Sequence, residues 1–286
     1  MINLIHENLS FFTVKFSLIS YFVVFIILLK IRSVRLVKTW FIPLFALYSG
    51  LVTASLFHVF LDGSISSLKT SGESLFTLIS DVFLLDGWGY VMYGGYFGLI
   101  IGYLIMNFVT RQKSLSTFLD ISAICTSLLF AICRIGCFVS GCCFGMPSRI
   151  FGISFSRGTD AFKYLKGTDL VVGEATVPLL PTQLISCFGD FAIFLFLLIL
   201  FCRNKTRYPY FFFFAQMFLY GLGRFIIEFF RIDPREFWGV LSMSQWISLV
   251  LVAASLVFFI KNRKEIAESF RKDVSENVST ERVSKK

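Results

Sequence analysis

Charged residues are scarce in this chain: Asp, Glu, Lys and Arg together make up 16% of its 286 residues. A soluble globular domain has about 25% charged and about 45–50% apolar residues, whereas 56% of this sequence is hydrophobic and its mean hydropathy is +0.76. Long apolar runs alternate with short clusters of Lys and Arg, a pattern typical of membrane proteins. The composition therefore excludes an ordinary soluble enzyme and predicts a membrane domain.

Two other features are missing. The first apolar run lacks the small-residue cleavage site of a secretory signal peptide and is longer than a usual h-region, so we expect a retained first helix. Nothing indicates nucleic-acid binding either, because the net charge of +9 lies mostly between apolar segments. Basic residues in such positions indicate topology and contact with anionic membrane lipids.

Seven apolar segments approach the roughly 20 residues that a helix needs to cross a bilayer. They are Phe11–Leu29, Phe41–Phe60, Trp88–Val109, Leu115–Cys133, Thr182–Cys202, Tyr210–Phe230 and Met243–Ile260. The shorter apolar stretch Ser74–Leu85 is expected to be interfacial or re-entrant. We predict an all-α polytopic membrane protein with about seven transmembrane helices. Residues 1–260 form a single transmembrane domain with an external irregular segment at about 134–180, and residues 261–286 form a charged cytoplasmic tail.

Basic residues follow the first, third and fifth expected spans and recur in the tail, whereas acidic residues dominate the second loop. The basic set includes Lys30, Arg32, Arg35, Lys38, Arg111, Lys113, Arg203, Lys205 and Arg207; the acidic set is Asp62, Glu73, Asp81 and Asp86. Because basic loops stay in the cytoplasm, we expect the N-terminus outside and the C-terminus inside.

Ionisable residues within apolar spans are costly and usually face an interior cavity. Tyr220, Arg224 and Glu228 recur every fourth residue in the sixth span, which places them on one helix face. The alternative is a purely structural Arg–Glu ion pair, in which the two charges only neutralise each other. A ligand explains the cost of burial better.

Arg134 follows the fourth apolar run and precedes a glycine-rich stretch. Two guanidinium groups from separate helices could clamp one phosphate, because their donors match phosphate oxygens in pairs. The alternative is an arginine that reaches out from a membrane boundary.

Two weaker signals are the glycine-rich Tyr93–Gly98, for which helix packing is an equal explanation, and Pro181-Thr182-Gln183, which is typical of a helix start.

The seven cysteines are an odd number, so at least one is unpaired within the chain. Cys133, Cys137, Cys142 and Cys143 lie within eleven residues but do not form the usual CxxC pairs of a zinc site. Adjacent cysteines do not easily share a tetrahedral metal, so we expect none. Disulfides and simple packing among small residues remain open.

Together these segments resemble the prolipoprotein diacylglyceryl transferase family. The family segment GRxGNFxNxExxG is matched by Arg134, Gly136, Phe138 and Gly145. The more specific YGLGRFxxExxR segment is matched by Tyr220–Phe225 with Glu228 and Arg231. Gly94 and Gly95 match the HGG segment, and Pro181, Gln183 and Leu184 match HPxQLYE.

The departures from the family pattern concern reactive side chains. Tyr93 replaces the HGG histidine, which is the usual candidate base, and the only histidines, His6 and His58, lie outside the motifs. In the arginine segment, the two asparagines and the glutamate are replaced by Cys137, Ser140 and Cys142, respectively. Ile185 and Ser186 replace the tyrosine and glutamate of the last motif. The chain thus resembles a cysteine-rich branch or a paralogue.

The resemblance implies transfer of the diacylglyceryl group of phosphatidylglycerol to the lipobox cysteine thiol of prolipoprotein signal peptides at the bacterial inner membrane, with release of glycerol phosphate. It implies no cofactor. The expected catalytic residues are Arg134, Arg224, Tyr220, Glu228 and Tyr93, although Tyr93 would be a poor base at its ordinary pKa of about 10. The expected substrate-binding residues are Gly94, Gly95, Gly136, Gly145, Gln183 and Arg231. Two alternatives are a paralogue with another lipid or acceptor and a non-catalytic phospholipid-binding protein.

Overall fold

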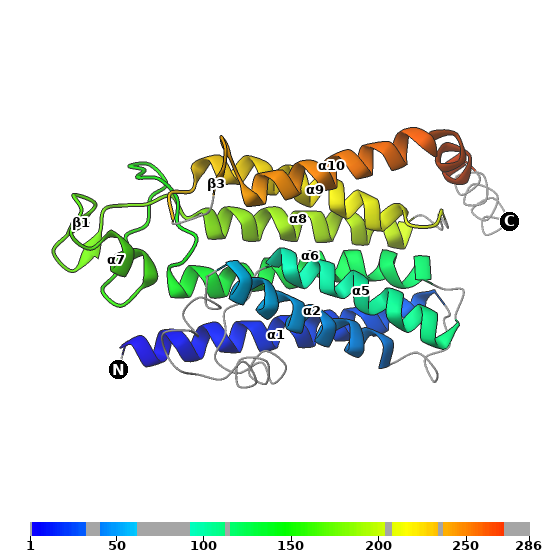
Figure 1. Cartoon of the computed structure of the whole chain (residues 1–286), viewed down its shortest axis with the longest axis horizontal. Helices are drawn as coiled ribbons and strands as arrows, with labels where there is room; N and C mark the ends of the chain where they lie inside the picture. Colours follow the sequence, from blue (N-terminus) through cyan, green and yellow to red (C-terminus); the bar gives the residue numbers. More distant parts are fainter. Residues whose placement is uncertain are drawn as a thin grey trace, which may run out of the picture. The chain divides into compact units, whose positions relative to one another are not determined.

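The computed structural model describes residues 2–32, 41–61, 92–111, 115–203, 208–233 and 237–271. The long helices are α1 (Ile2–Ile31), α2 (Phe41–Leu61), α5 (Met92–Thr110), α6 (Leu115–Ser140), α8 (Thr182–Arg203), α9 (Phe211–Ile227) and α10 (Met243–Lys261) (Figure 1). The short helix α7 (Asp160–Leu165) and the hairpin of β1 (Val171–Val172) and β2 (Ala175–Thr176) lie between α6 and α8. A second hairpin, β3 (Phe237–Trp238) with β4 (Leu241–Ser242), precedes α10.

Within the described residues, six helices are long and apolar enough to cross a membrane. They cover Phe12–Ile31, Tyr93–Thr110, Leu115–Ser140, Thr182–Arg203, Phe211–Phe230 and Met243–Lys261, whereas the apolar part of α2, Phe41–Phe57, is shorter. The predicted all-α polytopic class is confirmed, and the count of seven remains a prediction. The expected Ser74–Leu85 segment and the last part of the tail, residues 272–286, lie outside the described residues.

The chain divides into two compact units. One comprises Met1–Tyr21 and Asp120–Lys286, and the other comprises Phe22–Leu119. The boundaries fall within α1 and α6, so both units contain parts of these helices. The single domain expected over residues 1–260 therefore stays a prediction.

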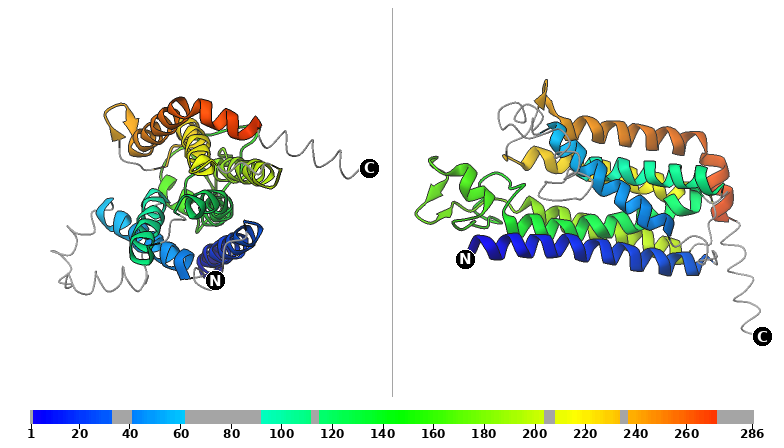
Figure 2. Two further views of the ribbon diagram at one scale, coloured as in Figure 1. Left: turned by 90° about the vertical axis from the view of Figure 1, so that its right-hand side faces the viewer. Right: turned by 60° about the horizontal axis from the view of Figure 1, so that its bottom comes forward.

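In the unit Phe22–Leu119, α2 and α5 cross closely (Figure 2). Glycines at every fourth position of α5 permit this approach: a Cβ atom at Gly94 would lie 2.8 Å from the carbonyl oxygen of Thr53, and one at Gly102 would lie 2.7 Å from Cα of Ala46. The hydroxyl of Ser49 donates a hydrogen bond to the carbonyl of Gly98 at 2.9 Å. The helix is continuous through these glycines, so their visible role is tight packing rather than an unwound turn.

In the other unit, α6 continues seven residues past the expected end at Cys133 and stops at Ser140. The boundary at residue 134 was therefore placed too early, because the apolar run ends before the helix does. The amide of Cys142 donates to the carbonyl of Cys137, and the amide of Gly141 donates to that of Phe138. This is a Schellman ending with Gly141 in the left-handed region at φ +74°. Arg134 consequently lies inside a helix.

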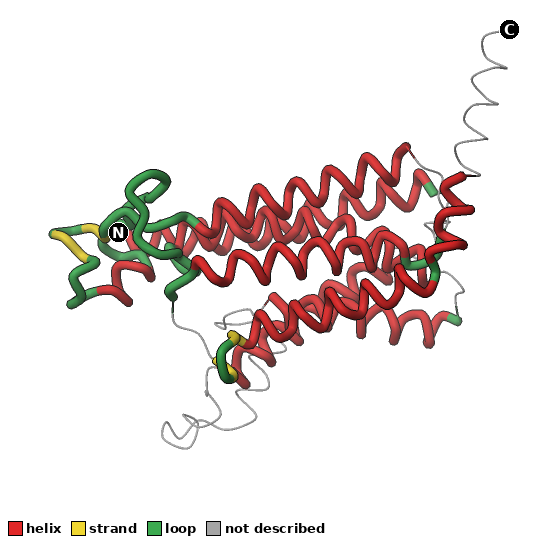
Figure 3. The backbone as a smooth tube through the Cα atoms, turned by 90° about the horizontal axis from the view of Figure 1, so that it is seen from above, coloured by secondary structure: helices red, strands yellow, loops and turns green. Residues whose placement is uncertain are grey.

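The irregular segment between α6 and α8 forms a small apolar core of its own, made of Phe144, Phe155, Ala161, Leu165 and Leu179. Figure 3 shows this segment as a cluster of loops beyond the end of α6 and the start of α8. Backbone hydrogen bonds join it to the neighbouring elements: the amide of Gly145 donates to the carbonyl of Leu180, and that of Met146 donates to the carbonyl of Phe230. The loop after α6 is thereby held against the ends of α8 and α9.

Side chains cap the starts of α9 and α10. The carboxylate of Asp120 accepts hydrogen bonds from the amides of Tyr210 at 3.0 Å and Phe213 at 2.9 Å, which links α6 to the start of α9. Ser242 and Gln245 form a reciprocal capping box at the start of α10. Both caps satisfy backbone donors that a helix leaves free at its first turn.

Candidate phosphate-binding site

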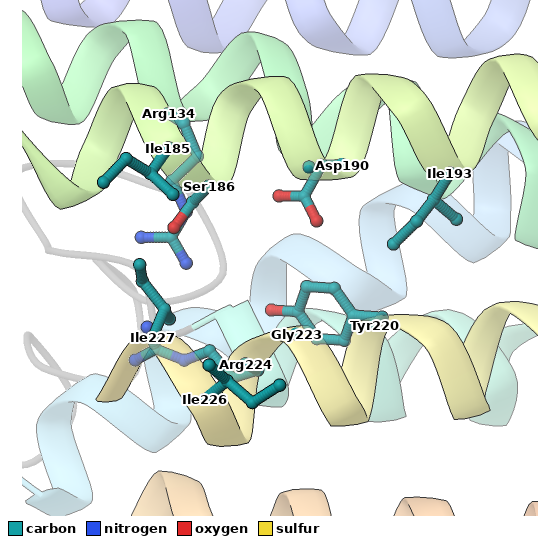
Figure 4. A pocket seen from close by; sticks show the side chains of 11 residues that line it. Arg134, Ile185, Ser186, Asp190, Ile193, Tyr220, Gly223, Arg224, Ile226 and Ile227 are labelled. Carbon is teal, nitrogen blue, oxygen red and sulfur yellow. The ribbon is translucent and has the colours of Figure 1, made fainter. Parts of the chain in front are cut away.

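A cavity of about 200 Å³ lies among α6, α8 and α9. It is lined by Arg134, Ile185, Ser186, Gly189, Asp190, Ile193, Tyr220, Gly223, Arg224, Ile226 and Ile227 (Figure 4). The structure therefore brings together three of the residues predicted to be catalytic: Arg134, Tyr220 and Arg224. Arg134 comes from α6, and Tyr220 and Arg224 come from α9, so these side chains meet only through the tertiary fold.

The two arginines retain hydrogen-bonding capacity within the protein interior. Nε of Arg134 and Nη1 of Arg224 are buried and have no hydrogen-bond partner among the described residues. Arg134 is only 4% exposed, so solvent does not hydrate its guanidinium freely. A buried donor without a partner costs about 1–3 kcal/mol, and more when it is charged. An anion that accepts from both guanidiniums would recover this cost.

Glu228, at the end of α9, holds one side of Arg224. Its carboxylate accepts from Nη2 of Arg224 at 3.0 Å, from Nη1 of Arg231 at 3.2 Å and from the hydroxyl of Ser242 at 3.0 Å. The Arg–Glu pair that the sequence left as an alternative does form. The pair uses only one of the two terminal nitrogens of Arg224. It therefore orients this guanidinium and leaves the other terminal nitrogen for a further partner. Glu228 itself does not line the cavity.

Arg231 is fully engaged in the same network and does not line the cavity. Its Nε and Nη2 donate to the two oxygens of Asp233 at 2.9 and 2.6 Å. Burial lowers the pKa of Arg231, but Cys143, Asp233 and Glu228 more than offset this effect, so its pKa lies above the usual arginine value. Arg231 was predicted to bind substrate; its described contacts are those of a residue that positions Glu228.

Tyr220 occupies the helix turn before Arg224. Its ring packs against Phe130 of α6 with the centroids 4.9 Å apart, and the residue is 5% exposed. Figure 4 shows its hydroxyl pointing into the cavity, between the side chains of Asp190 and Arg224. The hydroxyl is therefore available to a ligand as well as to its neighbours.

Asp190 is the residue that our sequence reasoning missed. It lies in α8, is 7% exposed and points its carboxylate into the cavity (Figure 4). The signal was present, because Asp190 is the sole acidic residue in the fifth apolar span. An ionisable group in an apolar helix is costly, and this holds for Asp190 as it does for Arg224.

Three other predicted binding residues lie outside the cavity lining. The side-chain amide of Gln183 donates to the carbonyl of Cys142 at 2.6 Å. A Cβ atom at Gly145 would lie 2.7 Å from Cγ2 of Thr182 and 2.8 Å from the carbonyl oxygens of Leu180 and Phe230. Gly136 is buried within α6. The contacts of Gln183 and Gly145 hold the loop after α6 in place.

Tyr93, Gly94 and Gly95 belong to the unit Phe22–Leu119, at the start of α5. Tyr93 is 5% exposed, and Gly94 has the close contacts to α2 described above. Their parts in catalysis and substrate binding stay predictions.

One further group concerns metal binding: the sulfur atoms of Cys137, Cys142 and Cys143 lie within 4.8 Å of one another.

Comparison with known proteins agrees with the motifs. The family model for prolipoprotein diacylglyceryl transferase matches residues 12–261. The chain is 32% identical over 213 residues to phosphatidylglycerol–prolipoprotein diacylglyceryl transferase 2 of Clostridium perfringens, covering 73% of this chain and 77% of that protein. It is 33% identical over 204 residues to the enzyme of Tolumonas auensis, covering 68% and 71%, and 31% identical over 176 residues to that of Clostridium tetani, covering 60% and 64%. This chain therefore belongs to the prolipoprotein diacylglyceryl transferase family.

Proposed function

We propose that this protein transfers the diacylglyceryl group of phosphatidylglycerol to the lipobox cysteine of prolipoproteins and releases glycerol phosphate. One observation carries the proposal: two largely buried arginines from different helices line one cavity, and each keeps a nitrogen without a hydrogen-bond partner among the described residues. An anionic head group satisfies both. The family relationship supplies the reaction, and the cavity supplies a place for its phosphate.

The reaction forms a bond between the cysteine sulfur and a glyceryl carbon, and it breaks the bond between that carbon and a phosphate oxygen. The electron pair of the broken bond stays on the phosphate, whose negative charge grows as the bond breaks. Arg134 and Arg224 stabilise this charge through hydrogen bonds that strengthen in the transition state. Removing one such preorganised donor typically lowers kcat by about 10²–10³-fold.

Two other cavity residues fit the rest of the head group. The hydroxyl of Tyr220 donates to a phosphate or glycerol oxygen. The carboxylate of Asp190 points into the cavity and would repel a phosphate, but it can accept from the two hydroxyls of the head-group glycerol. Asp190 thus favours phosphatidylglycerol over phospholipids without these hydroxyls.

The lipid enters sideways, between α8 and α9. Gly189 of α8 and Gly223 of α9 both line the cavity and are exposed, and a Cβ atom at either position would meet no other atom within 4 Å. Exposed isoleucines, Ile185 and Ile226, flank the same opening. The absence of side chains at the two glycines leaves room for acyl chains, while the phosphate lies deeper against the arginines.

The remaining expectations complete the proposal. Tyr93, Gly94 and Gly95 contribute from α5 as their counterparts do in the family motif. The loop segment between α6 and α8 faces the outside of the bacterial inner membrane, with the N-terminus outside and the C-terminus in the cytoplasm, as the distribution of Lys and Arg indicates. The single transmembrane domain at residues 1–260 and the cytoplasmic tail at 261–286 follow from the same topology.

A transfer assay tests the proposal. Purified protein, phosphatidylglycerol and a synthetic lipobox peptide are mixed, and the peptide mass is measured. The wild type should yield the diacylglyceryl peptide, and Arg224→Ala should yield almost none. Arg157→Ala is the matched control, because Arg157 pairs with Glu174 on the protein surface, where both side chains are more than 70% exposed. Bound phosphatidylglycerol without any product would instead support the non-catalytic lipid-binding alternative.

A further inference from the structure

Three cysteine thiols converge at the end of α6. Cys137 lies in the last turn of the helix, and Cys142 and Cys143 lie in the loop that follows. Their sulfur atoms are all within 4.8 Å of one another, and no disulfide joins them. Four sulfurs around a zinc ion at about 2.3 Å lie about 3.8 Å apart. A contraction of about 1 Å or less would therefore bring these three to ligand distance.

The backbone explains how two adjacent cysteines turn toward one centre, which the sequence spacing alone argued against. The Schellman ending reverses the chain at Gly141, and Cys143 then adopts the left-handed conformation at φ +59°. Non-glycine residues rarely adopt this conformation, and such strain is concentrated at functional sites. The combination places the sulfurs of Cys142 and Cys143 on the same side as Cys137.

Neighbouring elements hold this loop in place. The side chains of Gln183 and Thr182, at the start of α8, donate hydrogen bonds to the carbonyls of Cys142 and Cys143, respectively. Both side chains are almost fully buried. Two buried donors that fix two successive peptide groups are typical of the outer shell of a preorganised site. The backbone that carries Cys142 and Cys143 is thus fixed, and the hydrogen bond from the hydroxyl of Ser140 to the sulfur of Cys142 is long at 3.5 Å.

We propose that Cys137, Cys142 and Cys143 bind one Zn²⁺ ion whose fourth coordination position is open. Thiolate ligands select zinc over harder cations such as Mg²⁺. The local charges fit as well. Three thiolates and Zn²⁺ sum to one negative charge, and Arg134 and Arg231 both lie near enough to Cys143 to offset it electrostatically.

The open position has a use that rests on the proposed function. The acceptor substrate is itself a cysteine thiol, and a thiol that coordinates zinc loses its proton to the surrounding water. The resulting zinc-bound thiolate attacks the glyceryl carbon as the carbon–oxygen bond to phosphate breaks. The thioether product is a weaker ligand than a thiolate and leaves the metal.

This arrangement places the nucleophile beside the phosphate site. Cys137 follows Arg134 by three residues on the same helix, so the two side chains share one face of α6. It also accounts for the departures from the family pattern as one change. The family histidine that Tyr93 replaces is the usual candidate base, and a zinc ion would make a base unnecessary for deprotonating the thiol.

Metal analysis of the full-length protein in detergent tests the site. The wild type, purified under reducing conditions and supplied with Zn²⁺, should hold about one zinc per chain, as expected for a three-thiolate site. Cys137→Ser, Cys142→Ser and Cys143→Ser should each lower zinc retention at least about tenfold. Cys187→Ser and Cys202→Ser are matched controls that should keep the wild-type content. Zinc-free wild-type protein, or a disulfide among the three cysteines under these conditions, would overturn the proposal.

Cobalt separates the metal site from the transferase function. Co²⁺ in place of Zn²⁺ should give the visible absorption of a tetrahedral thiolate complex, and a lipobox peptide should change this spectrum, whereas a peptide with serine in place of the cysteine should not. Arg224→Ala should retain both the metal and the response to peptide while losing transfer. Zinc binding with no transfer by the wild type would reject the proposed function and leave the metal site standing. Transfer with no spectral response to the cysteine peptide would reject thiol activation.

Discussion

Two arginines near the end of α9 serve different purposes, although only seven residues separate them. Arg231 has each of its guanidinium nitrogens bonded to Glu228 or Asp233. Arg224 shares Glu228 but its Nη1 has no partner among the described residues, and neither has Nε of Arg134; both residues line the cavity. A buried guanidinium with all three nitrogens bonded is a structural element. A buried cation with spare donors indicates a ligand, because folding alone gains nothing from leaving them empty.

The largest effect is expected on stability, from replacing Arg231, whose guanidinium nitrogens are all bonded. Arg231→Ala removes the guanidinium that bonds both oxygens of Asp233 and leaves Glu228 with one cation, and breaking a buried pair in this way costs about 3–5 kcal/mol. Thermal unfolding of the detergent-solubilised protein should show a much lower Tm. Arg149→Ala, at an exposed position of the segment between α6 and α8, serves as the control. Equal melting of the two variants would contradict the structural role of Arg231.

On the open side, Arg224→Ala should leave the Tm nearly unchanged, because Glu228 still pairs with Arg231. Its kcat should fall by about 10²–10³-fold, the usual cost of losing one donor to a developing anion. Arg224→Lys should restore little, because an ammonium cannot hold Glu228 and a phosphate with one fixed fork. Mass spectrometry of the modified peptide gives the rates. If Arg224→Ala instead melted early and kept its kcat, the roles of the two arginines would be reversed.

The entrance between α8 and α9 should show a smaller effect. Gly223→Leu adds a side chain where the structure leaves open space, so we expect about a tenfold higher KM for phosphatidylglycerol, equivalent to about 1.4 kcal/mol. The fold should tolerate the change, because no atom lies within 4 Å of the added Cβ. Ala253→Leu, on an exposed face of α10, is the matched control. An unchanged KM for Gly223→Leu would place the lipid entrance elsewhere.

The smallest expected effect is on head-group selectivity. Asp190→Asn keeps the size of the side chain but replaces one acceptor oxygen with a donor. We expect the preference for phosphatidylglycerol over phosphatidylethanolamine to fall about fivefold, which corresponds to the roughly 1 kcal/mol of one hydrogen bond. Competition between the two lipids in the transfer assay measures the ratio. A lower rate with both lipids and an unchanged ratio would show that Asp190 acts on the arginines instead.

The helical membrane class and the arginine pair could be predicted from the sequence because both follow from the cost of transfer into an apolar medium. The end of α6 could not be found in this way, because the helix continues seven residues beyond its apolar run. The Ser140-Gly141 ending was a usable local signal. Asp190 was missed because it is a lone acidic residue in its apolar span, without the four-residue spacing that marks Tyr220, Arg224 and Glu228.

The cysteine cluster shows the limit of arguments from spacing. Adjacent cysteines predict divergent side chains only if the backbone is regular, and Cys143 is in the left-handed region. Likewise, Gln183 and Gly145 were predicted to bind substrate, but their described contacts hold the loop that carries the cysteines. Which backbone group a buried side chain will meet depends on tertiary contacts, and sequence patterns do not contain that information.

The cap that Asp120 places on α9 sets the depth of the two cavity arginines. Arg134 follows Asp120 by 14 residues in α6, and Arg224 follows Tyr210, whose amide Asp120 binds, by the same 14 residues in α9. At 1.5 Å per residue, both guanidiniums therefore start from Cα atoms about 21 Å from this joint. Asp120 is thus a fixed contact between the two helices, and the same length of chain separates it from each arginine. Deleting a single residue between this contact and one arginine would rotate that arginine about the helix axis by about 100°. The two guanidiniums would then no longer face the same cavity, although neither arginine had been substituted.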